Sequence, residues 1–300
     1  MLRFFANCFS GRRFPEIRPS GRRGFIEKVG FLLSVLALAA PVRADPGAQR
    51  NFNAADKAAE APSGDYPRSD LEAASRVVRT GRENRPDNAA SNHNVPTPAQ
   101  LKQIEIPEYI GARGRATFGR VTGDFSGTTD EILQWGAYKW GFDPDLVRAN
   151  AVDESFWHQN MVGDIDNGVS LGIMQIKSKY HLGTCPASPR FPPSVDAVEA
   201  HAIQRYLAGQ PSCLSFNFTA FSVDYRLAHL RACMNKSIRY LFNHEPASGH
   251  ARYADAIGDE LLWGCVGSWY SGYFWDAEAI AYVERVRRFY EQKPWLDASF

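Results

Sequence analysis

The segment from Asp143 to His158 constrains the fold most, because it is apolar on nearly every side of a helix. Asp143-Pro144 is a typical helix start, in which a capping carboxylate is followed by proline in the first turn. At about 100° per residue, the apolar side chains that follow spread around most of the helix circumference. A helix with this pattern is buried at the centre of a domain.

Glu154 is the acidic residue that this pattern places on the core side of the helix, near its C-terminus. Burial and the negative end of the helix dipole both disfavour the charged form of the carboxyl. The sequence therefore predicts a raised pKa for Glu154, which is what a general acid at neutral pH requires. A buried glutamate that is paired with an arginine for structural reasons is the alternative. Asp153 points about 100° away on the same helix and is a poor second carboxylate.

Further helices and one small β element are expected around this segment. Thr128-x-x-Glu131 is a capping box that opens a helix ending at Gly141. A turn-rich stretch, 163–168, precedes the apolar run 171–176, which indicates a short strand or a hairpin. Helical patterns also cover residues 194–208, 219–234, 256–266 and 276–291. The fold class predicted for residues 128–300 is mainly α, of an α+β type, with a small β-hairpin beside the central helix.

The amino terminus, residues 1–44, is typical of a secretory signal peptide. Basic residues precede a short apolar core, VGFLLSVLALAA at 29–40, and Val42-Arg43-Ala44 is a small-x-small cleavage site. The run from Arg22 to Ile26 resembles the twin-arginine export signal, with an ordinary secretory signal as the alternative. No apolar run reaches the roughly 18–20 residues of a membrane span, so no stable membrane anchor is expected. These features predict a periplasmic or secreted protein.

Residues 45–100 are predicted to be a disordered tether, because large apolar residues are scarce there and cannot offset the ordering entropy. Residues 101–127 are an ambiguous lead-in. The chain has 34 basic and 33 acidic residues, and removing the eight basic and two acidic residues of 1–44 leaves 26 and 31. Nucleic-acid binding requires a basic surplus, so a nucleic-acid partner is not expected.

Four cysteines follow the signal peptide, and an even number in an exported protein predicts two disulfides. Three pairings are possible. We favour Cys185–Cys213, which would close a proline-rich stretch, and Cys233–Cys265, which would tie two predicted helices together. Because there is no CxxC motif, neither a zinc site nor any other metal site is predicted.

Two motifs in this region resemble those of the superfamily of soluble lytic transglycosylases and goose-type lysozymes. Glu154-Ser155 matches the family's ES pair, and Gly172-Ile173-Met174-Gln175, about twenty residues later, matches its G-[LI]-M-Q strand. The entry to the helix, Tyr138-x-x-Gly141-Phe142-Asp143-Pro144, also matches. The segment from Gly264 to Gly272 resembles the third motif, A-Y-N-x-G, but Ser271 stands where asparagine is usual. The resemblance covers roughly residues 128–290.

This resemblance implies a lysozyme-like catalytic domain that cleaves the glycan strands of peptidoglycan between N-acetylmuramic acid and N-acetylglucosamine. Glu154 would act first as the acid and then as the base, producing a 1,6-anhydro sugar without metal or cofactor. Ser170, Met174, Gln175 and Tyr270 would contact the sugar. From the residues alone, Met174 could equally belong to the core, and Gln175 could serve to satisfy backbone groups.

Two alternatives remain open at the sequence level. A hydrolytic muramidase would use Asp164 or Asp166 as a second carboxylate that activates water, although Asp-Asn-Gly is also a common turn sequence. A non-catalytic peptidoglycan-binding protein on the same scaffold is the second alternative. Against it, a protein that only binds glycan has no need of a buried acid. The sequence identifies no protein partner.

Overall fold

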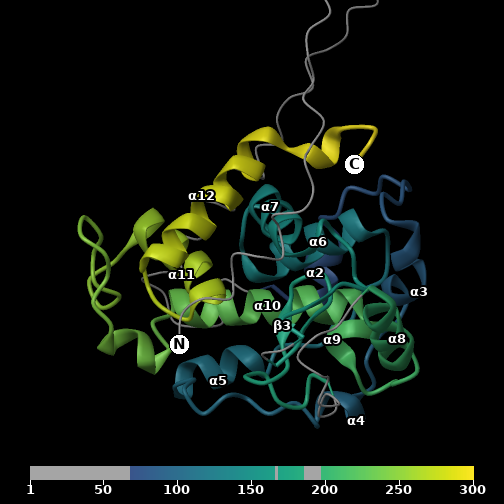
Figure 1. Cartoon of the computed structure of the whole chain (residues 1–300), viewed down its shortest axis with the longest axis horizontal. Coiled ribbons are helices and arrows are strands. Elements are labelled where there is room, and N and C mark those ends of the chain that lie inside the picture. Colours follow the sequence, from purple (N-terminus) through teal and green to yellow (C-terminus); the bar gives the residue numbers. More distant parts are fainter. Residues whose placement is uncertain (1–67, 166–167, 186–196) are drawn as a thin grey trace, which may run out of the picture. The chain divides into compact units, whose positions relative to one another are not determined.

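The computed structural model describes residues 68–165, 168–185 and 197–300, which are mainly helical and include one small antiparallel sheet (Figure 1). The N-terminal helices are α2 (Asp70–Ala74), η1 (Pro86–Asn88), α3 (Ala89–Asn92), α4 (Pro98–Leu101) and α5 (Ala112–Phe118). The central helices are α6 (Thr129–Trp140) and α7 (Pro144–Ser155). The C-terminal helices are α8 (Ala197–Ala208), α9 (Leu214–Asn217), α10 (Thr219–Met234), η2 (Arg239–Asn243), α11 (Gly258–Ser271), α12 (Ala277–Gln292) and η3 (Pro294–Leu296). The mainly helical class predicted from the sequence is confirmed.

Helices α6 and α7 begin where their capping residues predict, and α6 also ends at its predicted glycine stop. Helix α7 ends at Ser155, before the predicted end near His158, because Phe156 adopts a left-handed conformation. The Thr128 hydroxyl accepts a hydrogen bond from the Glu131 amide, and the Glu131 carboxylate accepts one from the Thr128 amide, which completes the capping box. Gly141 ends α6 at φ 73°, a left-handed conformation that glycine adopts without steric cost. Asp143 caps α7 by accepting a bond from the Asp145 amide at 2.8 Å.

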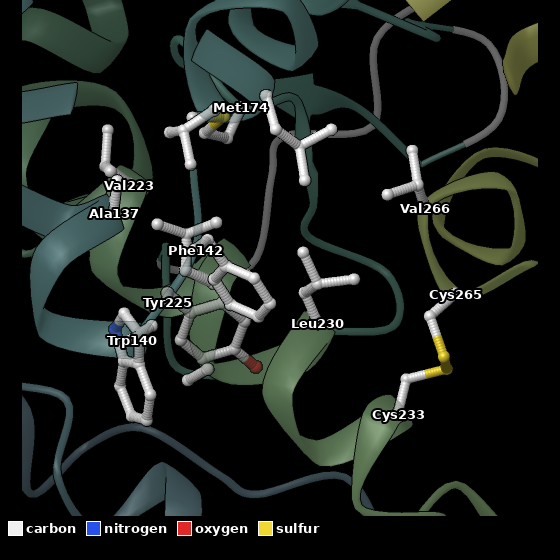
Figure 2. Packing of buried hydrophobic residues seen from close by; sticks show 14 of the residues in the cluster. Ala137, Trp140, Phe142, Met174, Val223, Tyr225, Leu230, Cys233, Cys265 and Val266 are labelled. Atoms are coloured by element: carbon white, nitrogen blue, oxygen red, sulfur yellow. A yellow bond between two sulfur atoms is a disulfide. The ribbon is translucent and has the colours of Figure 1, made fainter. Parts of the chain in front are cut away.

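The core is built where α7 and α10 meet their neighbours. Helix α7 packs against α6 and α12, and α10 packs against α5, α6 and α11 (Figure 1). Every residue of α10 is buried. Figure 2 shows Tyr225 and Leu230 of α10 beside Trp140 and Phe142, with Met174 of the hairpin in the same cluster. The central position predicted for α7 is consistent with this packing.

The β element is a three-stranded antiparallel sheet of β1 (Val162–Gly163), β2 (Ser170–Leu171) and β3 (Ile176–Lys177). Strands β2 and β3 form the predicted hairpin, with Leu171 opposite Ile176. The apolar run 171–176 is not one strand, because Gly172 to Gln175 form the turn between β2 and β3. Gly172 has φ 79°, and a Cβ there would run into the Ser215 carbonyl oxygen, so only glycine fits.

The prediction of a disordered tether over residues 45–100 is wrong for residues 68–100. This segment forms α2, η1, α3 and α4, and Asn88 and Asn92 are buried. It is held by polar contacts to α6 and to the turn after α7 rather than by a core of its own, which is why its composition resembles that of a disordered segment. Residues 45–67 and the predicted signal peptide, 1–44, lie outside the described residues.

The ambiguous lead-in, 101–127, is part of the same domain. Its helix α5 packs against α10, and Ile110 is buried and forms a β-bridge with Ile238. Within the described ranges, none of the helices combines the length and the apolar character needed to pass through a membrane.

The two predicted disulfides are present. Cys185–Cys213 joins the loop after β3 to the start of α9, and Cys233–Cys265 joins α10 to α11 (Figure 2). The second bond links helices that also pack against each other. The proline-rich stretch inside the first loop, residues 186–196, lies outside the described residues.

Candidate functional site

Glu154 lies one residue before the end of α7, and α12 holds its carboxyl group. The Tyr282 hydroxyl of α12 donates a hydrogen bond to Oε1 of Glu154. Asn150, one turn earlier on α7, donates from Nδ2 to the same hydroxyl oxygen. Tyr282 is buried, whereas Glu154 is partly exposed. The carboxyl group is therefore fixed in orientation from the protein side, in a residue that as a whole is partly exposed.

Helix α12 presents Tyr282 to α7 because its buried residues recur at helical spacing. Ala279, Tyr282, Val283 and Val286 form its buried face. Asp276 caps the helix by accepting a bond from the Ala279 amide at 2.8 Å. A tyrosine on such a face buries its ring and needs a partner for its hydroxyl, and here the partners are Glu154 and Asn150.

The pKa of the Glu154 carboxyl is raised to about 8, mainly by burial and also by the neighbouring Asp153 carboxylate. The hydrogen bond from Tyr282 and the positive charges of Arg226 and Arg285 act in the opposite direction on this pKa. Glu154 is thus mainly protonated at neutral pH, as the sequence predicted. Within the described ranges, Glu154 forms no hydrogen bond or salt bridge with an arginine, although the charges of Arg226 and Arg285 act on its pKa.

Asp153 is turned toward α12 and is paired there. Arg285 binds the Asp153 carboxylate in a bidentate manner, with 2.9 Å from Nε to Oδ1 and 3.1 Å from Nη2 to Oδ2. The same guanidinium lies 5.3 Å from the ring centroids of both Tyr270 and Tyr282. Asp153 is therefore occupied as an ion-pair partner and is not free to serve as a second catalytic carboxylate.

Tyr270, at the end of α11, is the predicted sugar-contacting residue that the structure best supports. Its ring stacks on that of Tyr282, with centroids 5.0 Å apart and planes 13° apart. Its side chain is 44% exposed, so it offers an accessible aromatic surface next to the residue that holds Glu154. Aromatic faces of this kind are suited to stacking on sugar rings.

Ser155 ties the ES pair to the hairpin. Its hydroxyl donates to the carbonyl oxygen of Ile173 at 2.9 Å. The Gly172–Gln175 turn is thereby fixed against the end of α7. The two motifs that the sequence separates are in direct contact in the fold.

The other predicted sugar contacts have structural roles. Met174 is fully buried in the core (Figure 2), so it presents no surface to a glycan, and its assignment as a sugar contact is not supported. Gln175 donates from Nε2 to the Gly172 carbonyl at 2.9 Å and so stabilises its own turn. Ser170 is buried and donates to Asp164 Oδ2 at 2.7 Å. These residues shape the hairpin.

Asp164 is partly exposed and ion-paired. Its Oδ2 accepts from Lys177 Nζ at 3.1 Å in addition to the Ser170 hydroxyl. Asp166, the other possible second carboxylate, lies outside the described residues. Among the described residues, no group of three or more His, Cys, Asp or Glu side chains is placed to hold a metal ion.

Sequence reasoning missed Tyr282, Arg285 and Arg226 as members of the site. Their signal in the sequence is weak, because the local sequence around a tyrosine or an arginine in a helix does not indicate which distant residue it will contact. Comparisons of the chain with models of protein families, with curated proteins and with solved structures give no match.

Proposed function

We propose that the protein is a peptidoglycan lytic transglycosylase, exported to the periplasm or secreted, in which Glu154 is the single acid and base. The observation that carries this proposal is that the carboxyl of Glu154, a partly exposed residue, is protonated at neutral pH and held by Tyr282 beside the exposed ring of Tyr270. The motif resemblance over residues 128–290 supplies the substrate class. Two disulfides are consistent with an exported protein.

The hydrogen bonds determine which oxygen of Glu154 carries the acidic proton. Asn150 donates to the Tyr282 oxygen, so the Tyr282 hydroxyl proton is directed at Oε1 of Glu154. Because Oε1 accepts this bond, the carboxyl proton is carried by Oε2. In the proposed reaction, this proton passes to the glycosidic oxygen as its bond to C1 of the muramic sugar breaks.

The second step returns the proton to Glu154. The 2-acetamido group of the muramic sugar stabilises the positive charge at C1. The Glu154 carboxylate then removes the proton of the sugar's own C6 hydroxyl, and the C6 oxygen bonds to C1. The product is a 1,6-anhydro sugar, and no water is consumed. The bond from Tyr282 stabilises the carboxylate between the two steps.

A mechanism with one carboxylate fits the neighbouring acids better than hydrolysis does. Asp153 is bound by Arg285, and Asp164 is bound by Lys177 and Ser170. A glycosidase that uses water needs a second carboxylate that is free to act as the base. A protein that only binds glycan would gain nothing from a buried acid, whose desolvation costs stability.

Product analysis tests this proposal directly. Purified cell walls are incubated with the wild-type protein, with Glu154→Gln and with Glu284→Gln, an exposed control on α12 that undergoes the same change of a carboxyl to an amide. Wild-type and control proteins should release fragments with anhydro ends, one water lighter than the hydrolysis products. Glu154→Gln should lose about 10²-fold to 10⁴-fold or more in rate. Reducing ends from the wild-type protein would favour the muramidase alternative, and full activity of Glu154→Gln would refute the site.

A further inference from the structure

Arg226 of α10 is a buried cation without an acidic hydrogen-bond partner among the described residues. The whole residue is inaccessible to solvent, and its Nε, Nη1 and Nη2 atoms form no hydrogen bond of good geometry within the described ranges. Its polar interaction is with the hydroxyl of Tyr282, the residue that also binds Glu154. Arginine is almost never fully buried unless it is paired, because desolvation of the cation is costly. A native protein that retains such a group needs another reason to keep it.

The immediate neighbours of Arg226 do not neutralise its charge. The guanidinium lies over the ring of Trp269 on α11, 4.5 Å from the ring centroid. Trp269 in turn contacts His181 and His229, with ring centroids 5.1 Å and 5.0 Å away. Burial lowers the pKa of both histidines, to about 3 for His181, so both are neutral near pH 7. A cation–π contact orients the guanidinium, but it supplies no counter-charge.

The groups that favour the charged form of Arg226 are Tyr282 and Glu154. The interaction is mutual, because Arg226 lowers the pKa of both the Glu154 carboxyl and the Tyr282 hydroxyl. Three helices therefore contribute to the surroundings of one carboxyl group. Helix α7 carries the carboxyl, α12 donates the hydrogen bond from Tyr282, and α10 carries the cation, Arg226. While Glu154 is protonated, the cation has no anionic partner. When Glu154 loses its proton, a buried pair of opposite charges forms.

We propose that Arg226 is the counter-charge of ionised Glu154, stabilising the carboxylate that exists after the acid has given its proton to the leaving sugar. Arg226 is inaccessible to substrate, so it is a positioning residue that acts through Glu154 and Tyr282. This inference rests on the proposed function for its catalytic meaning, although the pairing itself can be tested without any enzymatic assay.

Other ionisable groups near the pair keep their charge between pH 6 and 9. Arg285 lies on α12 and is bound to Asp153 of α7. On α11, Tyr270 has a pKa raised above its ordinary value by burial, so it stays neutral. Tyr282 likewise stays neutral, because burial raises its pKa. Glu154 is therefore the group of this cluster whose titration falls inside the window.

A double-mutant cycle in thermal unfolding tests the pairing. The melting temperatures of the wild-type protein, Arg226→Met, Glu154→Gln and the double variant are measured at pH 6 and pH 9. At pH 6, Arg226→Met should melt at the same temperature as the wild type or higher, because an unpaired buried cation is replaced by an apolar side chain of similar length. At pH 9, its melting temperature should fall relative to the wild type. In the Glu154→Gln background, the effect of Arg226→Met should be the same at both pH values.

An effect of Arg226→Met that does not change with pH, or that changes equally in the Glu154→Gln background, would overturn the proposal. Arg226→Lys is the second variant, because it keeps the charge on a side chain of similar length. It should retain the pH dependence of the wild type. If Arg226→Met fails to fold at pH 6 while Arg226→Lys folds, the charge is needed without ionised Glu154, and the proposal is wrong.

The pH profile of wall cleavage tests the catalytic meaning. Because Arg226 lowers the pKa of Glu154, its removal should raise that pKa and move the basic limb of the profile upward by about one pH unit or more. At the optimum, kcat should fall about tenfold with KM within twofold, and Arg226→Lys should restore most of the rate. An unchanged profile in Arg226→Met would refute the role in catalysis. If the wild-type protein does not cleave walls, the proposed function fails, while the unfolding cycle still decides the pairing.

Discussion

The hydroxyl of Tyr282 donates a hydrogen bond to Oε1 of Glu154, although the two residues are 128 positions apart in the sequence. Asn150 donates to the same hydroxyl, so the amide, the phenol and the carboxyl form one chain of hydrogen bonds between α7 and α12. In a buried setting, such a chain fixes the carboxyl group more firmly than either bond would alone.

Tyr282→Phe should therefore slow wall cleavage by about tenfold to a hundredfold while leaving the fold intact. Loss of the donor removes an influence that lowers the pKa of Glu154, so the basic limb of the pH–rate profile should move upward. Tyr290→Phe is the matched control on α12, because its hydroxyl donates to Asp143 instead, at 2.9 Å. Identical pH profiles for Tyr282→Phe and the wild type would contradict the assigned role of this hydroxyl.

The raised pKa of Glu154 makes protein stability depend on pH in a defined direction. The folded carboxyl titrates near pH 8, and its ordinary pKa is 4.5, so the folded state holds a proton that the unfolded state releases. The resulting stabilisation is complete below about pH 4.5 and is lost as the pH rises through 8. The loss is at most about 1.4 kcal/mol per pH unit.

Glu154→Gln should remove this dependence. Relative to the wild type, the free energy of unfolding of Glu154→Gln should increase as the pH rises from 5 to 9, so the variant becomes the more stable of the two, as measured by urea denaturation at each pH. Glu284→Gln, which is exposed, should follow the wild type. A constant difference between Glu154→Gln and the wild type over this range would mean that the carboxyl has no raised pKa.

Much of the helical framework could be predicted because local signals agreed with burial. The capping box at Thr128, the glycine stop at Gly141 and the cap at Asp143 place both ends of α6 and the start of α7 to within a residue or two. The 16-residue helices α10 and α12 have periodic or continuous apolar patterns that are long enough to be clear. Glu154 could be proposed from the same helix because burial of a carboxyl is itself a functional signal.

The rest depends on tertiary contacts that leave little trace in local sequence. Helix α11 continues to Ser271, beyond the predicted end at 266, although Gly264 and Gly267 are ordinarily unfavourable in helices. A Cβ at Gly264 would collide with Phe274, and one at Gly267 would lie 2.9 Å from the Ala279 side chain. Both glycines are therefore explained by close packing, which a sequence pattern does not reveal.

Tyr270 should contribute to glycan affinity rather than to the chemical step. Its exposed ring stacks on Tyr282 but forms no hydrogen bond with Glu154 among the described residues. Tyr270→Ala should raise KM for glycan fragments about threefold to tenfold, since aromatic contacts of this kind contribute about 0.5–1.5 kcal/mol. Tyr206→Ala on α8, 48% exposed, is the control and should leave KM unchanged. Equal effects of the two substitutions would exclude a specific contact at Tyr270.

The segment 68–100 should be required for a working site, contrary to what its composition predicts. After Glu154-Ser155 the chain turns through Phe156 and Trp157, both in left-handed conformations at φ 52° and 66°. These conformations are unfavourable for bulky side chains and persist only where the surroundings hold them.

Residues of this segment hold the turn directly. Asn88 donates to the Trp157 carbonyl at 2.6 Å and accepts from the Gln159 amide at 2.8 Å. Arg85 donates to the Phe156 carbonyl at 2.8 Å. Without Asn88, the two buried backbone groups of Trp157 and Gln159 would be left unsatisfied, at about 1–3 kcal/mol for each group.

A chain that begins at residue 68 should therefore fold and cleave walls, whereas one that begins at residue 101 should lose both stability and activity. Asn88→Ala in the full chain separates the contact from the truncation. It should lower the free energy of unfolding by about 2–4 kcal/mol, since it removes three buried hydrogen bonds, two of them to backbone groups of this turn. Asn94→Ala is the matched control, because Asn94 is exposed and donates to the Asn217 carbonyl at 2.8 Å, away from this turn. Urea denaturation gives the stabilities, and release of wall fragments gives the rates. If the chain from residue 101 were as stable and as active as the chain from residue 68, the turn after α7 would not depend on Asn88 and Arg85.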